Sequence, residues 1–251
     1  MRLMGGYASD VGHVRKVNQD AVILKNAMFD DVGIYDPDAH DAGFAVLAVC
    51  DGIGGLEHGE ISSNIVRSGI EQWCDEILRW INIRTVEPEI LYSHLKDAAD
   101  DWNARVVEFA RDTQTPTGTT MSILMLVRDR YFILQVGDSR IYRLQNKVLE
   151  QLTIDASVVR YRNGRPKSFL DNFMGKSYEL TFTSSSGMLS EEDVFIVCSD
   201  GFYHRLEPDD TVRFLEAKTE EGMVGACEEL IYKMIERGET DNISGLTVSI
   251  K

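Results

Sequence analysis

The sequence of 251 residues has few cysteines, no long apolar run and little positive charge. Its four cysteines show no paired spacing, which argues against both a zinc knuckle and a disulfide framework. No apolar run approaches the roughly 20 residues of a membrane-spanning helix, and the N-terminal residues lack the apolar stretch of a secretory signal. The 26 basic and 41 acidic side chains give a net charge of −15, which opposes binding to a nucleic-acid backbone. We therefore expect a soluble, cytoplasmic protein with no membrane span and no nucleic-acid partner.

The composition is that of a folded globular protein. Hydrophobic residues make up 43% of the chain and charged residues 27%, which is enough apolar material for a buried core. There is no Gly/Ser linker, no low-complexity tract and no repeat of fixed period. These features predict a single domain over residues 1–251, in which residues 154–177 form the least regular segment.

The pattern of apolar residues predicts an α+β domain. Two helices are expected after the first strands, beginning near Ile61 and near Pro88, a residue type favoured in the first helical turn. Short apolar runs separated by polar turns then predict antiparallel hairpins, and a helix over 222–237 precedes the last strand. The expected strands span residues 21–24, 44–50, 119–127, 131–136, 140–144, 148–152, 180–183, 194–198 and 243–250. This order favours a layered α+β fold over a parallel Rossmann sheet.

Five aspartates lie at the ends of predicted strands: Asp20, Asp51, Asp138, Asp200 and Asp241. Singly, an Asp-Gly pair after a strand is most often a turn, because both residues tolerate positive φ. Strands as apolar as these are central in a sheet, however, and carboxylates crowded at one edge repel one another and are hard to desolvate. Divalent cations remove that repulsion, and all-oxygen sites suit Mg²⁺ or Mn²⁺ rather than zinc. Taken together, the five aspartates predict a metal cluster.

Six short motifs surround these aspartates and run through almost the whole chain. They are Arg15-x-x-Asn18-Gln19-Asp20, Asp51-Gly52-Ile53-Gly54-Gly55 with Gly59-Glu60, Thr117-Gly118-Thr119-Thr120, Gly137-Asp138-Ser139-Arg140, Ser199-Asp200-Gly201 and Asp241-Asn242-Ile243-Ser244. In order and spacing they resemble the motifs of the metal-dependent serine/threonine protein phosphatases of the PP2C (PPM) family, in its compact bacterial form. One such motif is weak evidence, whereas six in the family's order are specific.

The resemblance implies a four-layer αββα sandwich, in which two antiparallel sheets are flanked by helix pairs, with a binuclear Mn²⁺ or Mg²⁺ centre at one end. By motif position, Asp51 would bridge the two ions, and the carbonyl of Gly52 would be a further ligand. Asp200 and Asp241 would hold one ion, and Asp20 would contribute through water. All of these positions are expected to lie together at one end of the sandwich.

The resemblance also implies how the reaction runs. Asp138 matches a position that, together with Asp200, holds a third, weaker ion. Arg15 matches the arginine that grips the substrate phosphate, and a bidentate guanidinium suits that role. Arg15, Asp20 and Asp51 are therefore the residues expected to carry catalysis. Water activated by the ions would attack phosphorus in line, without a covalent phosphoenzyme.

The expected substrates are proteins phosphorylated on serine or threonine, and the expected counterpart is a bacterial serine/threonine kinase. Two alternatives stay open. A degenerate member of the family could act as a regulatory or scaffold module without turnover, although such members usually lack a metal carboxylate. The same ions could also hydrolyse another phosphate ester, because a fold does not fix a substrate.

The sequence departs from the family pattern at several positions. Gln19 stands where many relatives have glutamate, so a direct role as a ligand is not expected. The histidine proposed as the acid for the leaving group is absent at both Ile53 and Leu56. His58 lies close by in sequence, but a lone loop histidine is more often solvated, and the same holds for His13.

Residues 154–177 correspond to a flap that is longer in relatives. This segment contains a basic cluster of Arg160, Arg162, Arg165 and Lys167. A charged loop is usually a solvated surface, but in a protein of charge −15 local positive charge could steer a phosphorylated partner. We hypothesise that this cluster contributes to substrate docking.

Overall fold

The computed structural model describes residues 3–26, 43–53, 58–83, 85–162 and 165–251. The chain begins with three strands, continues with two long helices and then forms further strands, and short helices together with the longer α5 precede the last strand. In chain order the elements are β1 (Leu3–Asp10), β2 (Asp20–Asn26), β3 (Phe44–Asp51), α1 (Gly59–Trp80), α2 (Pro88–Asp112), β4 (Met121–Val127), β5 (Arg130–Val136), β6 (Arg140–Gln145), β7 (Val148–Gln151), β8 (Ser157–Arg162), β9 (Arg165–Leu170), β10 (Thr183–Met188), β11 (Val194–Cys198), α3 (Asp200–Tyr203), the 3₁₀ helix η2 (Pro208–Thr211), α4 (Val212–Glu216), α5 (Glu220–Glu236) and β12 (Ile243–Ile250).

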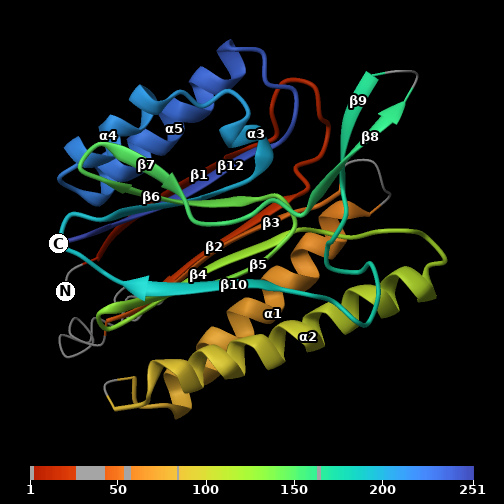
Figure 1. Ribbon diagram of the computed structural model, residues 1–251, viewed down its shortest axis with the longest axis horizontal. Helices are drawn as coiled ribbons and strands as arrows, with labels where there is room; N and C mark the ends of the chain where they lie inside the picture. The colour runs from red at the N-terminus through yellow and green to blue at the C-terminus, as the bar shows by residue number, and fades with distance from the viewer. Residues whose placement is uncertain (1–2, 27–42, 54–57, 84, 163–164) are drawn as a thin grey trace.

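Two five-stranded sheets form the centre of the molecule. One has the strand order β1-β12-β11-β6-β7 and the other β10-β5-β4-β3-β2. The strand pairs within both sheets are antiparallel, as the sequence predicted. Strands β8 and β9 pair only with each other and stand away from the two sheets (Figure 1).

Helices cover the outer face of each sheet, so the fold has four layers. Helices α1 and α2 lie on one side of the sandwich, and α4 and α5 lie on the other (Figure 1). Strand β3 shows how the layers are built: Val46 and Ala48 belong to the core beneath α1 and α2, whereas Leu47 and Val49 belong to the core between the sheets. This alternation follows from the two-residue period of a strand. The predicted αββα sandwich is confirmed.

The helix pair over the second sheet packs closely. Helix α2 begins at Pro88, which occupies its first turn as predicted, and buries an apolar stripe that includes Leu95 and Trp102. Gly69 of α1 lies directly against the Trp102 ring, and a Cβ atom at this position would overlap it. The glycine therefore allows the two helices to approach each other above the sheet.

Some predicted elements were wrong, and some observed elements were not predicted. Strand β10 begins at Thr183, so the strand expected over residues 180–183 was wrong except at its last residue. The sequence did not reveal β1 or the short helices between β11 and α5. Part of the segment 154–177, expected to be irregular, forms the β8–β9 hairpin.

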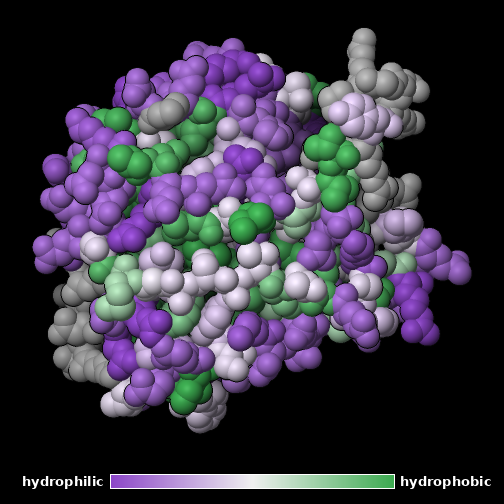
Figure 2. Space-filling view, in the orientation of Figure 1, coloured by the Kyte–Doolittle hydropathy of each residue, from purple (hydrophilic) through white to green (hydrophobic). Residues whose placement is uncertain are grey.

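The surface is largely polar over the helices. Figure 2 shows hydrophilic residues over α4 and α5, with apolar residues interspersed along the strands between the helix layers. Within the residues that the structure describes, no helix combines the length and the apolar character needed to cross a membrane.

Candidate metal and phosphate site

The candidate site lies at one end of the sandwich, where the two sheets meet. Asp20 is the first residue of β2 and Asp51 the last residue of β3, and the antiparallel register places them directly opposite each other. Such residues point to the same face of a sheet. The backbone of Asp51 is fixed by Thr120, whose hydroxyl accepts a hydrogen bond from the Asp51 N–H at 2.9 Å and whose own N–H donates to the Asp51 carbonyl at 2.8 Å.

The other sheet supplies Asp200 and Asp241. Asp200 follows β11 and begins the short helix α3, while Asp241 lies just before β12, which pairs with β11. Ser199 joins the two sheets, because its hydroxyl donates to Asp20 Oδ2 at 2.9 Å and accepts from the Ser244 N–H at 3.0 Å. The two halves of the site are thus tied together by direct hydrogen bonds.

Asp138 lies in the turn that passes from β5 to β6, and so from one sheet to the other. Gly137 has a φ of 109°, a conformation that favours glycine at this turn. Buried polar groups hold the turn from beneath: Gln135 donates to the Gly137 carbonyl at 2.8 Å and Ser122 donates to the Ser139 carbonyl at 2.7 Å. From α3, the Tyr203 hydroxyl donates to the Asp138 carbonyl at 3.0 Å.

The carboxylates act on one another electrostatically. Burial raises the pKa of Asp20 from 3.8 to about 6, and Asp241 adds to this rise. Burial likewise raises the pKa of Asp200 to about 8, with further contributions from Asp241, Asp138 and Asp20. The pKa of Asp51 lies well above its usual range, first because of burial and then because of the other four aspartates. The structure therefore brings the five sequence-predicted aspartates into one repulsive cluster.

The donor set of this cluster fits a hard divalent cation. Asp20 and Asp200 each have a buried Oδ1 oxygen with no hydrogen-bond donor among the described residues. A buried carboxylate oxygen without a donor is costly, and a cation would satisfy it. The described residues contain no group of three His, Cys, Asp or Glu side chains arranged to hold a metal ion. Mg²⁺ keeps several water ligands when bound to proteins, so carboxylates can hold it partly through water without forming one close group.

The loop that carries Gln19 packs tightly against Gly52. The Gly52 N–H donates to the Gln19 carbonyl at 3.0 Å. A Cβ atom on Gly52 would overlap the carbonyl oxygens of Gly59 and Gln19, so this position accepts only glycine without rearrangement. The Gln19 side chain donates to Glu60 at 3.3 Å rather than to the aspartates.

Arg15 is a cationic residue that pairs directly with one of the five aspartates. Its Nη2 donates to Asp241 Oδ2 at 2.6 Å, and about a third of each side chain is exposed. Asp241 is the main cause of the raised pKa of Arg15, and Asp51 and Asp200 contribute as well. The residue expected to grip phosphate is thus paired with a residue expected to hold metal.

Asn242 connects the loop of Arg15 to β12. Its side-chain amide donates to the carbonyls of Val11 and Val17, and its Oδ1 accepts from the Gln19 N–H. A Cβ atom on Gly201 would overlap the Asn242 carbonyl oxygen, so α3 packs closely against the backbone of Asn242. The Asp-Asn motif was recognised in the sequence, but the role of its asparagine as a clamp was not.

Two further residues at the site escaped the sequence analysis. Glu239 is buried and accepts hydrogen bonds from the N–H groups of Thr240 and Asp241 at 2.7 and 3.1 Å. His204, at the end of α3, has Nε2 4.0 Å from Asp200 Oδ2 and Nδ1 3.7 Å from Glu239 Oε2. Neither belongs to a motif recognised in the sequence, although Glu239 lies two residues before Asp241 and His204 lies four residues after Asp200.

The histidines considered from the sequence flank the site: His58 precedes Gly59, which packs against Gly52, and His13 follows Gly12, which packs against the Asp241 carbonyl. His58 precedes α1 with a φ of 62°, and its ring packs edge-on against Phe109 of α2. His13 is exposed. Leu56, one position where relatives carry histidine, lies outside the described residues, and Ile53 is half-buried.

The β8–β9 hairpin rises from the rim of the site. The Ala156 N–H donates to the Gly137 carbonyl at 2.9 Å, next to Asp138, and the Ala156 carbonyl accepts from Asp171 at 2.8 Å. The exposed side chains of Val159 and Tyr161 lie on β8. The side chains of the basic cluster lie outside the described part of the structure.

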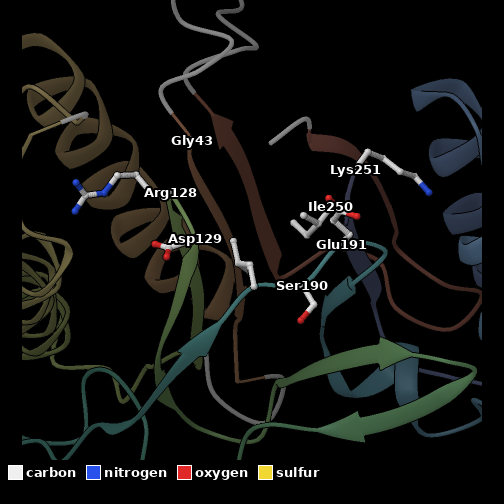
Figure 3. Close-up of a pocket in the computed structure, with 8 residues that line it drawn as sticks. Gly43, Arg128, Asp129, Ser190, Glu191, Ile250 and Lys251 are labelled. Carbon is white, nitrogen blue, oxygen red and sulfur yellow. The ribbon is translucent and has the colours of Figure 1, made fainter.

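A separate pocket lies at the far end of the molecule (Figure 3). It is lined by residues that include Gly43, Ser190 and Ile250. Gly43 precedes β3 whereas Asp51 ends it, so a strand of eight residues, roughly 25 Å long, separates the pocket from the carboxylates. The pocket takes no part in the site.

A fold of two helix-covered antiparallel sheets, with acidic residues where the sheets meet, is the architecture expected of a metal-dependent phosphatase. The sequence profile of the Protein phosphatase 2C family matches residues 30–223. The chain therefore belongs to this family and is a protein phosphatase.

Individual relatives agree with this assignment. A serine/threonine phosphatase, stp, of Listeria monocytogenes is 24% identical over 257 residues, which cover 96% of this chain and 94% of the relative. A putative protein phosphatase of Mycoplasma genitalium is 24% identical over 232 residues, covering 82% of this chain and 85% of the relative.

Solved structures share the fold. Serine/threonine phosphatase Stp1 from Staphylococcus aureus matches with a TM-score of 0.79 and 19% identity, covering 100% of this chain and 96% of that one. The serine/threonine phosphatase of S. agalactiae matches with a TM-score of 0.78 and 21% identity, over 99% and 100% of the two chains. At these identities the matches establish the fold alone.

Proposed function

We propose that this phosphatase hydrolyses phosphoserine and phosphothreonine on proteins at a binuclear Mn²⁺ or Mg²⁺ centre, and that it opposes a serine/threonine kinase. The observation that carries the proposal is the cluster of five aspartates, drawn from both sheets, with raised pKa values at Asp20, Asp51 and Asp200. Such mutual repulsion is unfavourable for a merely structural site and is relieved by cations. The names of the relatives support the choice of serine and threonine.

Asp51 is proposed to be the carboxylate shared by the metal centre, the Gly52 carbonyl would be a further ligand, Asp200 and Asp241 would hold one ion, and Asp20 would act through water. Asp138 would contribute to a third, weaker site. When bound, the ions would supply an acidified water as nucleophile and neutralise charge on the phosphoryl group.

The protein's own residues orient the substrate and the carboxylates. Arg15 would bind the phosphate through its guanidinium once it leaves Asp241, because planar N–H donors match phosphate oxygens. Ser199 keeps Asp20 in place, and the clamp of Asn242 keeps the Arg15 loop close to the cluster.

The test is hydrolysis of a small aryl phosphate. The wild-type protein should require added Mn²⁺ or Mg²⁺, and Asp51→Asn and Asp241→Asn should each lower kcat by about 100-fold or more, as expected for loss of an ion's contribution of several kcal/mol. Asp97→Asn, an exposed site on α2, is the matched control and should keep full activity. Phosphothreonine and phosphotyrosine peptides then test residue preference. Metal binding without turnover on any phosphate ester would favour the scaffold alternative instead.

A further inference from the structure

The aspartates of the site differ in how their oxygens are occupied. Asp20 and Asp200 each present a buried Oδ1 without a donor among the described residues. Asp241 does not: its Oδ1 accepts from the Asn242 N–H at 2.9 Å, and its Oδ2 accepts from Arg15 at 2.6 Å. A cation that approaches Asp241 therefore meets a carboxylate whose two oxygens are both engaged by the protein.

We propose that Arg15 is a resident cation on Asp241 that a divalent ion must displace, so that metal loading releases Arg15 toward the substrate phosphate. This inference rests on the proposed function, because it assumes that Asp241 is a metal ligand. It gives Arg15 a second role that precedes phosphate binding.

The geometry allows this exchange without unfolding of the loop. The loop of residues 11–19 is anchored by its backbone, whose carbonyls at Val11 and Val17 and N–H at Gln19 are bound by Asn242. The Arg15 side chain is about one-third exposed, so it can change partners while these anchors persist. The Asp241 backbone N–H is held separately by Glu239.

The exchange also couples the two ligands. If a metal ion favours the state in which Arg15 has left Asp241, and phosphate favours the same state, each ligand raises the affinity for the other. Phosphate would then bind weakly to the metal-free protein, because its guanidinium is engaged. The device would keep the protein from capturing phosphate groups before it can hydrolyse them.

The experiment is a calorimetric titration of the full chain with Mn²⁺ in the absence of phosphate. Arg15→Ala should bind Mn²⁺ about three- to tenfold more tightly than the wild type, as expected for removal of a partly exposed, charge-assisted contact. Lys16→Ala, which removes the same charge from the neighbouring exposed residue, measures the effect of long-range repulsion alone and should change affinity by less than about twofold. Arg15→Gln repeats the test with a polar side chain, and circular dichroism verifies folding of each variant.

The outcomes separate the two proposals. Equal shifts for Arg15→Ala and Lys16→Ala, or no shift at Arg15, would overturn the displacement of Arg15 while leaving the metal centre intact. Failure of the wild-type protein to bind Mn²⁺ would overturn the proposed function and this inference with it. Tighter binding that is confined to the two Arg15 variants would support it.

Discussion

Replacement of Asp20 by asparagine should stabilise the metal-free protein. The pKa of Asp20 is raised from 3.8 to about 6 in the folded state, mainly by burial. The folded protein therefore binds a proton at Asp20 more tightly than the unfolded chain does. The contribution of Asp20 to stability falls as the pH rises from about 4 through 6. The rise in pKa corresponds to a loss of folding stability of roughly 3 kcal/mol at pH 8, where Asp20 is ionised. An asparagine carries no charge, and its amide oxygen can still accept the hydrogen bond from Ser199.

We expect Asp20→Asn to raise the free energy of unfolding by about 2 kcal/mol at pH 8 in the presence of a chelator, since part of the repulsion is relieved when neighbouring carboxylates share protons. For a chain of this size the melting temperature should rise by roughly 4–8 °C. The gain should disappear below about pH 4, where Asp20 is protonated in both states. Urea unfolding followed by the fluorescence of the buried Trp73 and Trp102 measures the difference.

Asp97→Asn provides the control for this experiment, because Asp97 is exposed on α2. A variant at Asp20 that is less stable than the wild type at pH 8, or a gain that does not depend on pH, would refute the repulsion argument. With saturating Mn²⁺ the order should reverse, because the wild type gains stability from a bound ion in proportion to its affinity.

Two further predictions concern the surroundings of the cluster. Gly201→Ala should lower the free energy of unfolding, measured in urea, by about 2–4 kcal/mol and should weaken Mn²⁺ binding, because its Cβ would push α3 away from the Asn242 carbonyl. The control is an alanine at Gly225, where a Cβ meets no atom within 4 Å, and it should not weaken Mn²⁺ binding. A neutral result at Gly201 would contradict this close packing. Charge reversal of the basic cluster in the β8–β9 hairpin should lower kcat/KM for phosphopeptides and phosphoproteins by about tenfold while sparing a small aryl phosphate, and equal activity on all substrates would remove the cluster from substrate docking.

Much of the fold was predictable from local pattern. Strand β3 was recognised because its apolar run is continuous, and the structure shows it buried between the other sheet and the helices. Strand β1 was missed because it contains two adjacent glycines and depends on pairing with β12, which is distant in sequence. Gly6 lies against the backbone of α5, where a Cβ would not fit, so its presence reflects packing rather than strand propensity. Strand β10 was misplaced because its sequence, TSSSGM, has no apolar alternation.

The candidate site could be predicted in part because its aspartates belong to local sequence patterns. Aspartates next to apolar strands are visible in a sequence, and the structure brings all five of them together. Their partners were not visible, because the contacts of Ser199 with Asp20 and of Asn242 with the Arg15 loop join residues that are distant in sequence. Glu239 contacts the N–H of Asp241 locally but belongs to no motif recognised in the sequence. The pairing of Arg15 with Asp241 joins residues 226 positions apart, and no local pattern encodes it.

The division of the acidic residues between the sheets has a mechanical consequence. Asp20 and Asp51 end strands of one sheet, Asp200 and Asp241 adjoin strands of the other, and the turn of Asp138 is one of the connections that pass between the two sheets at this end. An ion shared by these groups would link the two sheets at this end of the sandwich. Catalytic activity and stability against separation of the two sheets would then depend on the same ion, and a chelator would destabilise the fold as well as abolish activity.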